Sequence, residues 1–384
     1  MKVCFICNEY PPGPHGGIGT CVQVLARELA QSGHQVRVAG MYPRSYPSAD
    51  YEEDQGVRVW RFRRPPGPIA AITSRYHLYK HISRWCQNGE VDIVEVPDWA
   101  GWAAGWPKLP VPVVARLNGS ASYFAAEING SVGNTTYWLE RASLRRVDYW
   151  CSVSNYTAAK TRDLFKLRRG PDAILYNPVE IQPAVAGNRT SNQDVVFTGT
   201  LTEKKGVIPL FKAWHQVLAE CNDAKLHVYG KDRATIDGQS MQQYLCSLLS
   251  SDELQHVIFH GHLERDALFQ VLRQARLAVF PSYAEAFALA PLEAMACGCP
   301  TIASKRGAGS ELMRDDQDGL LVDPDNVDEI SAAIIRLLQN DQVAARLGEA
   351  GRARIEQTFS IHKLRSQNEA FYRQCIEAYS QMAA

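Results

Sequence analysis

The sequence predicts an α/β protein with two domains, each built around an open parallel sheet. Its 384 residues exceed the size at which a single hydrophobic core stops growing, and 46% of them are hydrophobic, which is enough for two cores. Short apolar runs alternate with longer amphipathic stretches along the chain, which is the order that parallel strands joined by helices require.

The first half of the chain contains four short apolar runs that we expect to be strands, at residues 2–7, 35–40, 91–96 and 111–117. Between the first two runs, residues 20–32 place apolar side chains at helical spacing, and Ser-Gly-His at residues 32–34 closes this helix. The chain therefore begins with a strand, helix, strand unit.

A linker is expected around residues 177–193, where Pro, Gly and Asn are frequent and no apolar period is visible. Five further strand-like runs follow it, at residues 194–200, 225–230, 257–262, 277–282 and 299–304. The boundaries predict one domain over residues 1–178 and a second over residues 190–361. An amphipathic helix is expected over about residues 362–384, and it is able to pack back on the first domain.

Composition narrows the class of protein. Lys plus Arg and Asp plus Glu number 41 each, so no global field favours nucleic acid or an anionic membrane, and any anion site must be local. The apolar run at the N-terminus is too short for a secretory signal, and no run of eighteen apolar residues occurs. The ten cysteines are scattered, so we expect a soluble protein of the reducing cytoplasm.

A glycine-rich segment, GPHGGIGT, lies between the first strand and the first helix. Gly16, Gly17 and Gly19 would let backbone amides approach a phosphate at the start of that helix. The spacing differs from the dinucleotide-binding fingerprint, and an ordinary turn that needs glycine is an equally simple explanation. The segment alone does not decide between the two.

A second segment, residues 281–300, places two carboxylates around a helix start. Pro291 suits the first helical turn, which puts the cap near Leu289 or Ala290. Unpaired amides and the helix dipole would then face an anion. An acidic residue at a helix start usually interacts favourably with the helix dipole, and this explains Glu293. It does not explain Glu285, which lies outside the helix.

Several segments in order resemble one family. PSYAEAFALAPLEAMACGCPTIAS resembles the E-x7-E signature of the retaining nucleotide-sugar glycosyltransferases of family four, which have the GT-B fold. The similarity extends to EYPPGPHGGIGT, VSNYTA, ILYNPVE, FTGTLTEKKGV and DGLLVDPDN. The resemblance implies two Rossmann-like domains that face each other across a cleft, with the first on the acceptor side and the second binding the nucleotide sugar.

The resemblance also implies roles for particular residues. Glu293 would bind ribose hydroxyls, Glu285 would bind hydroxyls of the donor sugar, and Lys205 would neutralise the departing diphosphate. Backbone amides of the second domain and two glycines from across the cleft would hold the diphosphate: Phe287, Ala288 and Leu289, with Gly16 and Gly17. Asp98 and His15 would lie on the acceptor side.

Three positions depart from the family pattern. Thr200 stands where the family commonly has Arg, so one cation is missing, and three residues are candidates to replace it: Lys204, Arg306 and Arg116. Asn118 stands in place of a His and cannot carry a proton, which favours a donor sugar with a missing or altered 6-hydroxyl. Ala288 replaces a Gly and would cost about 1 kcal/mol if that position needs a positive φ.

The sequence therefore predicts a retaining glycosyltransferase that moves a sugar from a nucleoside diphosphate, with UDP favoured, to a hydroxyl of a sugar, lipid-linked or small-molecule acceptor. The resemblance implies that no metal or other cofactor is required, and no nucleic-acid partner is expected. A peripheral membrane contact and the oligomeric state stay open. Two alternatives remain: a nucleotide-sugar-binding or scaffold protein that lost catalysis, and a dinucleotide-dependent oxidoreductase suggested by the glycine-rich segment.

Three features near these motifs have simpler explanations. The basic run at residues 61–68 is expected to be a solvated loop, although it could also meet an anionic or lipid acceptor. Trp99, Trp102 and Trp106 either stack on a sugar or fill the core. The DPD segment at residues 323–325 is expected to be a helix cap and not a cation site.

Overall fold

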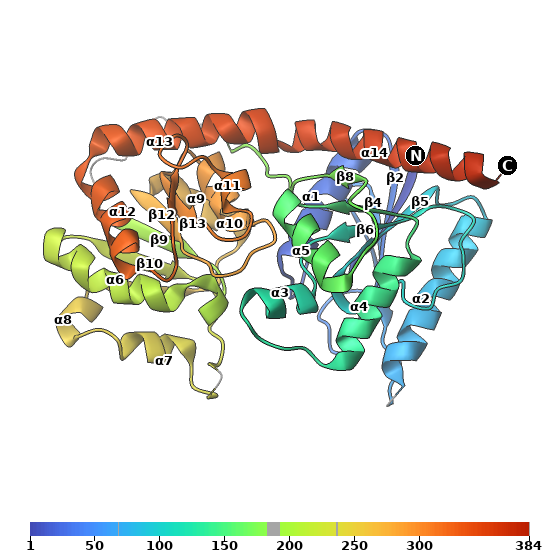
Figure 1. The fold of residues 1–384 in the computed structure, drawn as a ribbon, viewed down its shortest axis with the longest axis horizontal. Helices are drawn as coiled ribbons and strands as arrows, with labels where there is room; N and C mark the ends of the chain where they lie inside the picture. The colour runs from blue at the N-terminus through green and yellow to red at the C-terminus, as the bar shows by residue number, and fades with distance from the viewer. Residues whose placement is uncertain (68, 183–192, 236, 384) are drawn as a thin grey trace. The chain divides into compact units, whose positions relative to one another are not determined.

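The computed structural model describes residues 1–67, 69–182, 193–235 and 237–383. It divides the chain into two compact units: unit 1 is Met1–Pro178 with Ile361–Ala384, and unit 2 is Val179–Ser360. Figure 1 shows that each unit has strands at its centre and helices around them. Residues 183–192, most of the predicted linker, lie outside the described residues.

Unit 1 is built on a mixed sheet. Its elements are β1 (Lys2–Ile6), α1 (Gly17–Gln31), β2 (Gln35–Tyr42), β3 (Tyr51–Asp54), β4 (Val57–Arg63), α2 (Ala70–Gln87), β5 (Ile93–Pro97), η1 (Trp99–Gly101), β6 (Val113–Leu117), α3 (Ala121–Glu127), α4 (Asn134–Arg146), β7 (Tyr149–Ser152), α5 (Asn155–Phe165), β8 (Ala173–Ile174) and α14 (Ile361–Ala383). The sheet has eight strands in the order β3-β4-β2-β1-β5-β6-β7-β8. The edge strand β3 pairs with β4 in the antiparallel direction, while the neighbouring pairs such as β1 with β5 are parallel.

Unit 2 is built on a parallel sheet of six strands in the order β11-β10-β9-β12-β13-β14. Its elements are β9 (Asp194–Thr198), η3 (Glu203–Lys205), α6 (Val207–Glu220), β10 (Lys225–Tyr229), α7 (Met241–Cys246), α8 (Ser251–Leu254), β11 (Val257–Gly261), α9 (Arg265–Gln274), β12 (Leu277–Phe280), α10 (Leu289–Ala296), β13 (Thr301–Ser304), α11 (Gly309–Leu312), β14 (Leu320–Val322), α12 (Val327–Gln339), α13 (Asp341–Arg354) and η4 (Ile355–Phe359). This order, 3-2-1-4-5-6 within the unit, is that of a doubly wound nucleotide-binding sheet.

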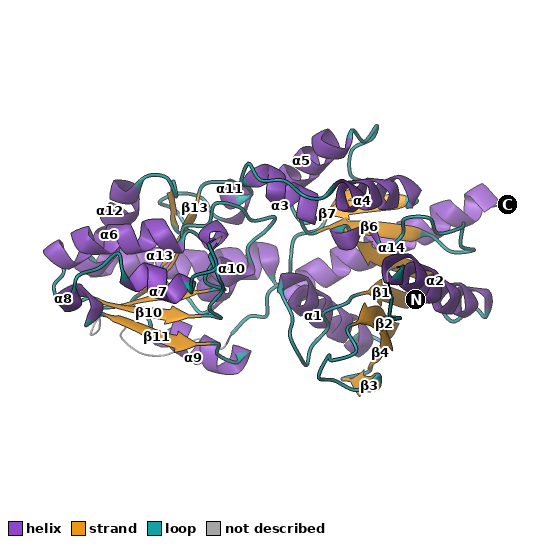
Figure 2. Ribbon diagram, turned by 90° about the horizontal axis from the view of Figure 1, so that it is seen from below, coloured by secondary structure: helices purple, strands orange, loops and turns teal. Residues whose placement is uncertain are grey.

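Helices cover both faces of each sheet, and Figure 2 shows these layers. Because side chains alternate along a strand, Cys4 and Ile6 of β1 pack with α2 and α4, whereas Val3 and Phe5 pack with α1 and α14. Parallel strands that are buried on both faces appear in the sequence as near-continuous apolar runs. This is why these strands could be predicted from the sequence.

The predicted two-domain α/β architecture is confirmed, and every predicted strand overlaps a strand of the structure. The sequence missed five strands: the short strands β7, β8 and β14, the edge strand β3 and its neighbour β4. The prediction of a solvated loop at residues 61–68 is wrong at its start, because Arg61 to Arg63 end β4 and Arg61 is only 1% exposed. Among the described residues, no helix combines the length and the apolar character needed to cross a membrane.

The C-terminal helix α14 runs along unit 1 (Figure 1) and is tied to its sheet by a buried polar network. Arg116 of β6 makes two hydrogen bonds to the Glu95 carboxylate of β5, at 2.8 and 2.9 Å. Arg116 also donates to Asn368 of α14 at 2.5 Å, and the Tyr372 hydroxyl of α14 donates to Glu95 at 2.6 Å. Each charge is therefore paired and hydrogen-bonded, as burial requires.

We expect Arg116→Met to destabilise unit 1 by about 3–5 kcal/mol, because it leaves the Glu95 carboxylate buried without its cation. Urea unfolding followed by tryptophan fluorescence measures the change. The control is Arg162→Met, whose ion pair with Asp163 is solvent-exposed. Equal unfolding midpoints for the two variants would contradict the expectation.

Candidate functional site

The loops after β9 and β12 lie at the point of unit 2 where the strand order reverses. The chain leaves β9 for β10 on one side, and β12 occupies the other side of β9. In open α/β sheets, ligands bind beyond the carboxyl ends of the strands at such a point. Lys205 lies in the loop after β9, and Glu285 lies in the loop after β12.

These two loops are locked together by a backbone contact that only glycine allows. Gly206 has φ +69°, and a Cβ atom there would stand 1.7 Å from the carbonyl oxygen of Pro281. The amide of Tyr283 also donates to the carbonyl oxygen of Lys204, at 2.8 Å. The position of Lys205 relative to the β12 loop is thus set by the backbone.

Lys205 and Glu285 form an ion pair, with Nζ 2.5 Å from Oε1. Burial by itself raises the pKa of Glu285, but the ammonium groups of Lys205 and Lys204 lower it by a larger amount. The pKa of Glu285 therefore lies below its usual value. Glu285 is therefore a carboxylate at neutral pH. It can accept hydrogen bonds but cannot donate a proton.

Helix α10 begins beside this pair. Its N-cap is Ala288, at φ −70° and ψ 126°, so the strain considered for an alanine at this position does not arise. The amides of Ala288, Leu289 and Ala290 precede the first intrahelical hydrogen bonds, and Pro291 has no N–H to offer. Phe287 is buried, and its ring packs 5.4 Å from that of Phe359.

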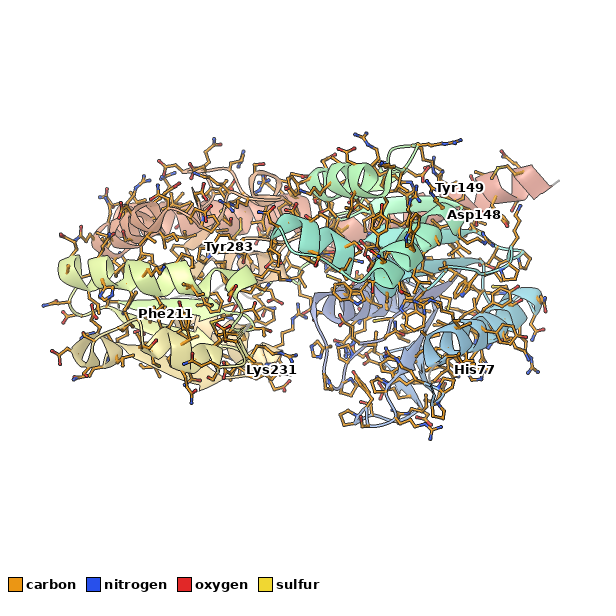
Figure 3. All side chains as sticks on the ribbon, turned by 60° about the horizontal axis from the view of Figure 1, so that its bottom comes forward. His77, Asp148, Tyr149, Phe211, Lys231 and Tyr283 are labelled. Atoms are coloured by element: carbon orange, nitrogen blue, oxygen red, sulfur yellow. The ribbon has the colours of Figure 1, made fainter. Side chains whose placement is uncertain are left out.

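The N-terminus of α10 borders a hollow in unit 2, which the loop after β13 closes on the other side. Residues that line it include Ser282, Glu285, Ala288, Ser304, Arg306 and Gly309. Arg306 pairs with Asp323 at 3.1 Å and with Asp325, and it lies over the Tyr283 ring at 5.4 Å. Tyr283 is labelled in Figure 3. A carboxylate, an arginine and helix amides thus line one hollow.

Thr200 lies two residues beyond the end of β9. Gly199, with φ +152°, precedes it, and a Cβ atom on Gly230 would stand 1.8 Å from the Gly199 carbonyl oxygen. Lys205 Cδ lies 4.0 Å from the place where a Cβ atom on Gly199 would stand. The segment of Thr200 therefore adjoins Lys205, as expected from its spacing in the sequence.

Glu293 lies within α10 and is buried, at 8% exposure. Arg265 of α9 reaches it, with Nε 3.2 Å from Oε1, and also contacts Glu180 at 3.0 Å. Burial raises the pKa of Glu293, and Arg265 offsets only part of that rise. The contact of Arg265 with Glu293 was not predicted. In the sequence, Arg265 appears only as a basic residue at the start of an amphipathic helix.

In unit 1 the strand order reverses between β1 and β5, and the glycine-rich loop follows β1. Helix α1 begins at Gly17 with Gly16 as its N-cap. The carboxylate of Glu9, which was not predicted to take part, accepts from the Gly19 amide at 2.9 Å. One amide at this helix start is therefore already bound to an anion of the protein itself. The ring of His15, next to Gly16, is exposed.

Buried tyrosines and Arg61 hold the loop after β1. The Tyr42 hydroxyl donates to the carbonyl of Cys7 at 2.8 Å, and the Tyr46 hydroxyl donates to that of Pro14 at 3.1 Å. Arg61, the residue wrongly placed in a solvated loop, donates to the carbonyl of Pro11 at 2.8 Å. The loop is thus shaped by β2, β4 and the segment between β2 and β3.

Asp98 follows β5 and is completely buried. Its two carboxylate oxygens accept from the amides of Asn118 and Gly119, at 3.0 and 3.1 Å. Burial raises the pKa of Asp98 to about 8, although these amides lower it in part. In this arrangement Asp98 positions Asn118, at the end of β6, and its direct contact with an acceptor stays a prediction.

The family follows from matches that together span nearly the whole chain. Residues 15–182 match the family described as Glycosyltransferase Family 4, and residues 179–354 match Glycosyl transferases group 1. The chain is a glycosyltransferase of the family-four type.

Relatives of this glycosyltransferase match it along most of their length. A glycogen synthase of Mycobacterium tuberculosis is 26% identical, covering 94% of this chain and 91% of that protein. A GDP-mannose-dependent monoacylated alpha-(1-6)-phosphatidylinositol monomannoside mannosyltransferase of Corynebacterium glutamicum is also 26% identical, covering 94% of each chain.

Solved structures show the fold of the glycosyltransferase to be GT-B. A sucrose-phosphate synthase from Thermosynechococcus elongatus superposes with a TM-score of 0.81 at 21% identity, covering 98% of this chain and 99% of that one. The HepE protein of Anabaena, in complex with UDP and glucose, has a TM-score of 0.71 at 18% identity, covering 97% and 100%.

The structure brings some predicted residues of the glycosyltransferase together and assigns others to packing. Lys205, Glu285 and the α10 amides meet in unit 2, while Gly16, Gly17, His15, Asp98 and Asn118 lie at strand ends of unit 1.

Trp102 and Trp106 fill the core, whereas Trp99 is 43% exposed. In the DPD segment, the α12 cap is the following residue, Asn326, so the expectation of a cap within residues 323–325 is wrong by one position.

Within the described residues, no group of three or more His, Cys, Asp or Glu side chains is placed to hold a metal ion. Independence from metal stays a prediction. The roles assigned to individual site residues also stay predictions.

The pKa of Glu293 is raised, so this carboxylate takes up a proton at a higher pH than an ordinary glutamate does. As the pH falls, we therefore expect nucleotide affinity to weaken earlier than it would with an ordinary glutamate at this position. In its predicted role, the ionised carboxylate of Glu293 would accept hydrogen bonds from ribose hydroxyls, and protonation would weaken that contact. Glu293→Gln should bind UDP about tenfold to a hundredfold more weakly and lose this acid dependence.

Calorimetric titration with UDP from about pH 8 to about pH 5 measures both effects. Glu264→Gln is the control, since Glu264 precedes Arg265 but is 92% exposed. Affinity of Glu293→Gln within twofold of the unaltered enzyme would contradict the ribose role.

Proposed function

We propose that this glycosyltransferase transfers a sugar from a nucleoside diphosphate, with UDP favoured, to an acceptor hydroxyl, with retention of anomeric configuration and without a metal ion. The observation that carries the proposal is the meeting of Lys205, Glu285 and the α10 N-terminus beyond the central strands of unit 2. A diphosphate needs cations and amide donors, and a sugar needs acceptors for its hydroxyls. This corner of unit 2 offers both.

In the proposed reaction, the bond from the anomeric carbon to the diphosphate oxygen breaks as the acceptor oxygen attaches to that carbon. Negative charge develops on the diphosphate, where Lys205 and the amides of Ala288 and Leu289 would stabilise it. Such preorganised donors are worth about 3 kcal/mol each. The acceptor proton passes to the departing phosphate, so the reaction needs no protein base, and attack from the departing face retains the configuration.

Glu285 would bind a hydroxyl of the donor sugar. Its carboxylate is ionised, and Lys205 already orients one of its oxygens. Because an ionised carboxylate is an acceptor only, it suits hydroxyl donors. The same ion pair would then couple the sugar site to the diphosphate site through one short contact.

The family commonly has an arginine at the position of Thr200, and Arg306 is the best of the three candidates to supply that cation instead. Arg116 is buried in the network that holds α14, and burial lowers the pKa of Lys204. Arg306 lines the hollow with Glu285 and Ala288. Burial by itself lowers the pKa of Arg306, but the carboxylates of Asp325 and Asp323 raise it by a larger amount. The guanidinium of Arg306 therefore stays charged.

The donor is proposed from the solved relatives and from one substitution. The HepE structure contains UDP and glucose, while the Corynebacterium relative is named as GDP-mannose-dependent, so both nucleotides occur among relatives. We favour UDP. Asn118, positioned by Asp98, replaces a His of the family, and we propose a sugar whose 6-hydroxyl is absent or altered. The acceptor would be a sugar, lipid-linked or small-molecule hydroxyl.

The alternative is a nucleotide-sugar-binding protein with weakened catalysis, for which Thr200 and Asn118 are the supporting residues. Both functions predict stabilisation by a nucleotide. Only the transferase predicts release of the nucleotide from its sugar and a new glycoside.

We expect a panel of UDP and GDP sugars, including 6-deoxy donors, to reveal nucleotide release and a glycosylated product by mass spectrometry. Lys205→Ala should lower kcat about a hundredfold to a thousandfold, because a donor to the developing anion is lost. The product's anomeric configuration, read by nuclear magnetic resonance, tests retention. Stabilisation by nucleotides without any turnover would favour the binding protein, and activity lost on chelation would refute metal independence.

We expect Arg306→Ala to lower kcat by at least about tenfold, and Thr200→Arg introduced into that variant to restore part of the loss. Lys305→Ala is the matched control, because Lys305 pairs with the same Asp323 but does not line the hollow. Steady-state kinetics with the active donor measure the effect. Equal kcat values for the Arg306 and Lys305 variants would reject Arg306 as the second cation.

A further inference from the structure

We propose that helix α2 of unit 1 docks on an anionic membrane surface through one exposed stripe. The stripe, called the α2 surface here, consists of Ile69, Ile72, Tyr76, Lys80 and Arg84. These residues follow one another at steps of three or four, so they share one face of the helix. Its apolar members lie at the N-terminal end and its basic members toward the C-terminal end.

The apolar end of the α2 surface is strongly exposed. Ile69, Ile72 and Tyr76 are 60%, 70% and 63% exposed, respectively. The opposite face of α2 supplies the packing, because Ser74, Leu78, Ile82 and Cys86 are buried. The α2 surface is therefore not required for the core, and contiguous exposed apolar side chains mark a contact site.

The region around α2 carries a local excess of positive charge. No Asp or Glu occurs between residues 55 and 89, while seven Lys and Arg do, in a chain whose formal net charge is zero. Arg58, Arg61 and Arg63 are held by acidic residues of the neighbouring segment. Lys80 and Arg84, together with Arg64 at the start of the preceding loop, remain exposed.

Two histidines and an aromatic ring pack beside the basic end of the α2 surface. His77, labelled on α2 in Figure 3, packs 4.9 Å from His81, and His81 stacks on Phe62 at 4.2 Å. Burial is the main cause of the lowered pKa of His81, and the neighbouring His77, Arg84 and Lys80 lower it as well. Lys80 Nζ lies 5.9 Å from the Tyr76 ring, which links the two ends of the stripe.

The arrangement fits a lipid surface better than a protein partner. The N-terminal end of α2 projects from unit 1 (Figure 1), so its apolar side chains can enter the boundary between headgroups and acyl chains. Basic side chains behind that end would meet anionic headgroups, each strengthening binding about fivefold. Exposed apolar side chains and nearby cations supply the two contributions to such binding, which are buried apolar area and attraction to anionic lipids.

The test is co-sedimentation of the full chain with vesicles of phosphatidylcholine alone and with vesicles that also contain phosphatidylglycerol. We expect binding to the anionic vesicles only, weakened by salt. Ile72→Asp, and separately Lys80→Glu with Arg84→Glu, should each reduce binding by more than about tenfold.

Two controls change exposed residues of unit 1 outside α2: Ile128→Asp, at 50% exposure, and Arg162→Glu. Both should bind as the unaltered protein does, and all variants should keep its melting temperature. Equal binding to both vesicle types, or binding unaffected by the α2 substitutions, would overturn the proposal.

A competing outcome would also overturn it. If soluble polyglutamate binds as tightly as the anionic vesicles, and Ile72→Asp leaves that binding unchanged, the surface serves an acidic macromolecule instead. The assay contains no nucleotide sugar, so its result is independent of the proposed transferase reaction.

Discussion

The contact between Gly206 and the carbonyl of Pro281 is the constraint on which the candidate site of unit 2 depends. It brings the loop after β9 against the loop after β12, with no side chain between them. Lys205 precedes that glycine and Glu285 follows that proline by four residues, so one backbone contact sets the position of both. A larger residue at Gly206 would separate the loops and, with them, the cation and the carboxylate.

The carboxylates of the candidate sites share a second feature: each already has a protein partner. Glu285 has Lys205, Glu293 has Arg265, and Glu9 has the amide of Gly19. Buried charges require such pairing, because leaving them unpaired costs far more than the pair itself contributes. A ligand in these sites must therefore share or replace existing contacts. Selectivity would then arise from how well a hydroxyl or phosphate competes with the protein's own groups.

Much of the fold followed from local pattern. Strands buried on both faces appear as continuous apolar runs, and helices that cover them appear as amphipathic segments, so the central strands of both sheets were predictable. The short strands β7, β8 and β14 and the edge pair of β3 and β4 lack that pattern. Arg61 shows the reason: its basic neighbours suggested solvent, yet its guanidinium is buried, and its Nη2 donates to Glu52 and to the carbonyl of Pro11.

The sequence by itself determined the two α/β units, the family resemblance and the loops that carry Lys205 and Glu285, because strand order and motif spacing are local properties of the chain. Only the tertiary structure decided that Arg265 holds Glu293, that Asp98 supports Asn118, and that Trp102 and Trp106 belong to the core. These contacts join residues on different elements. Their formation depends on burial and on which polar groups remain to be satisfied, and neither quantity can be read from the order of residues alone.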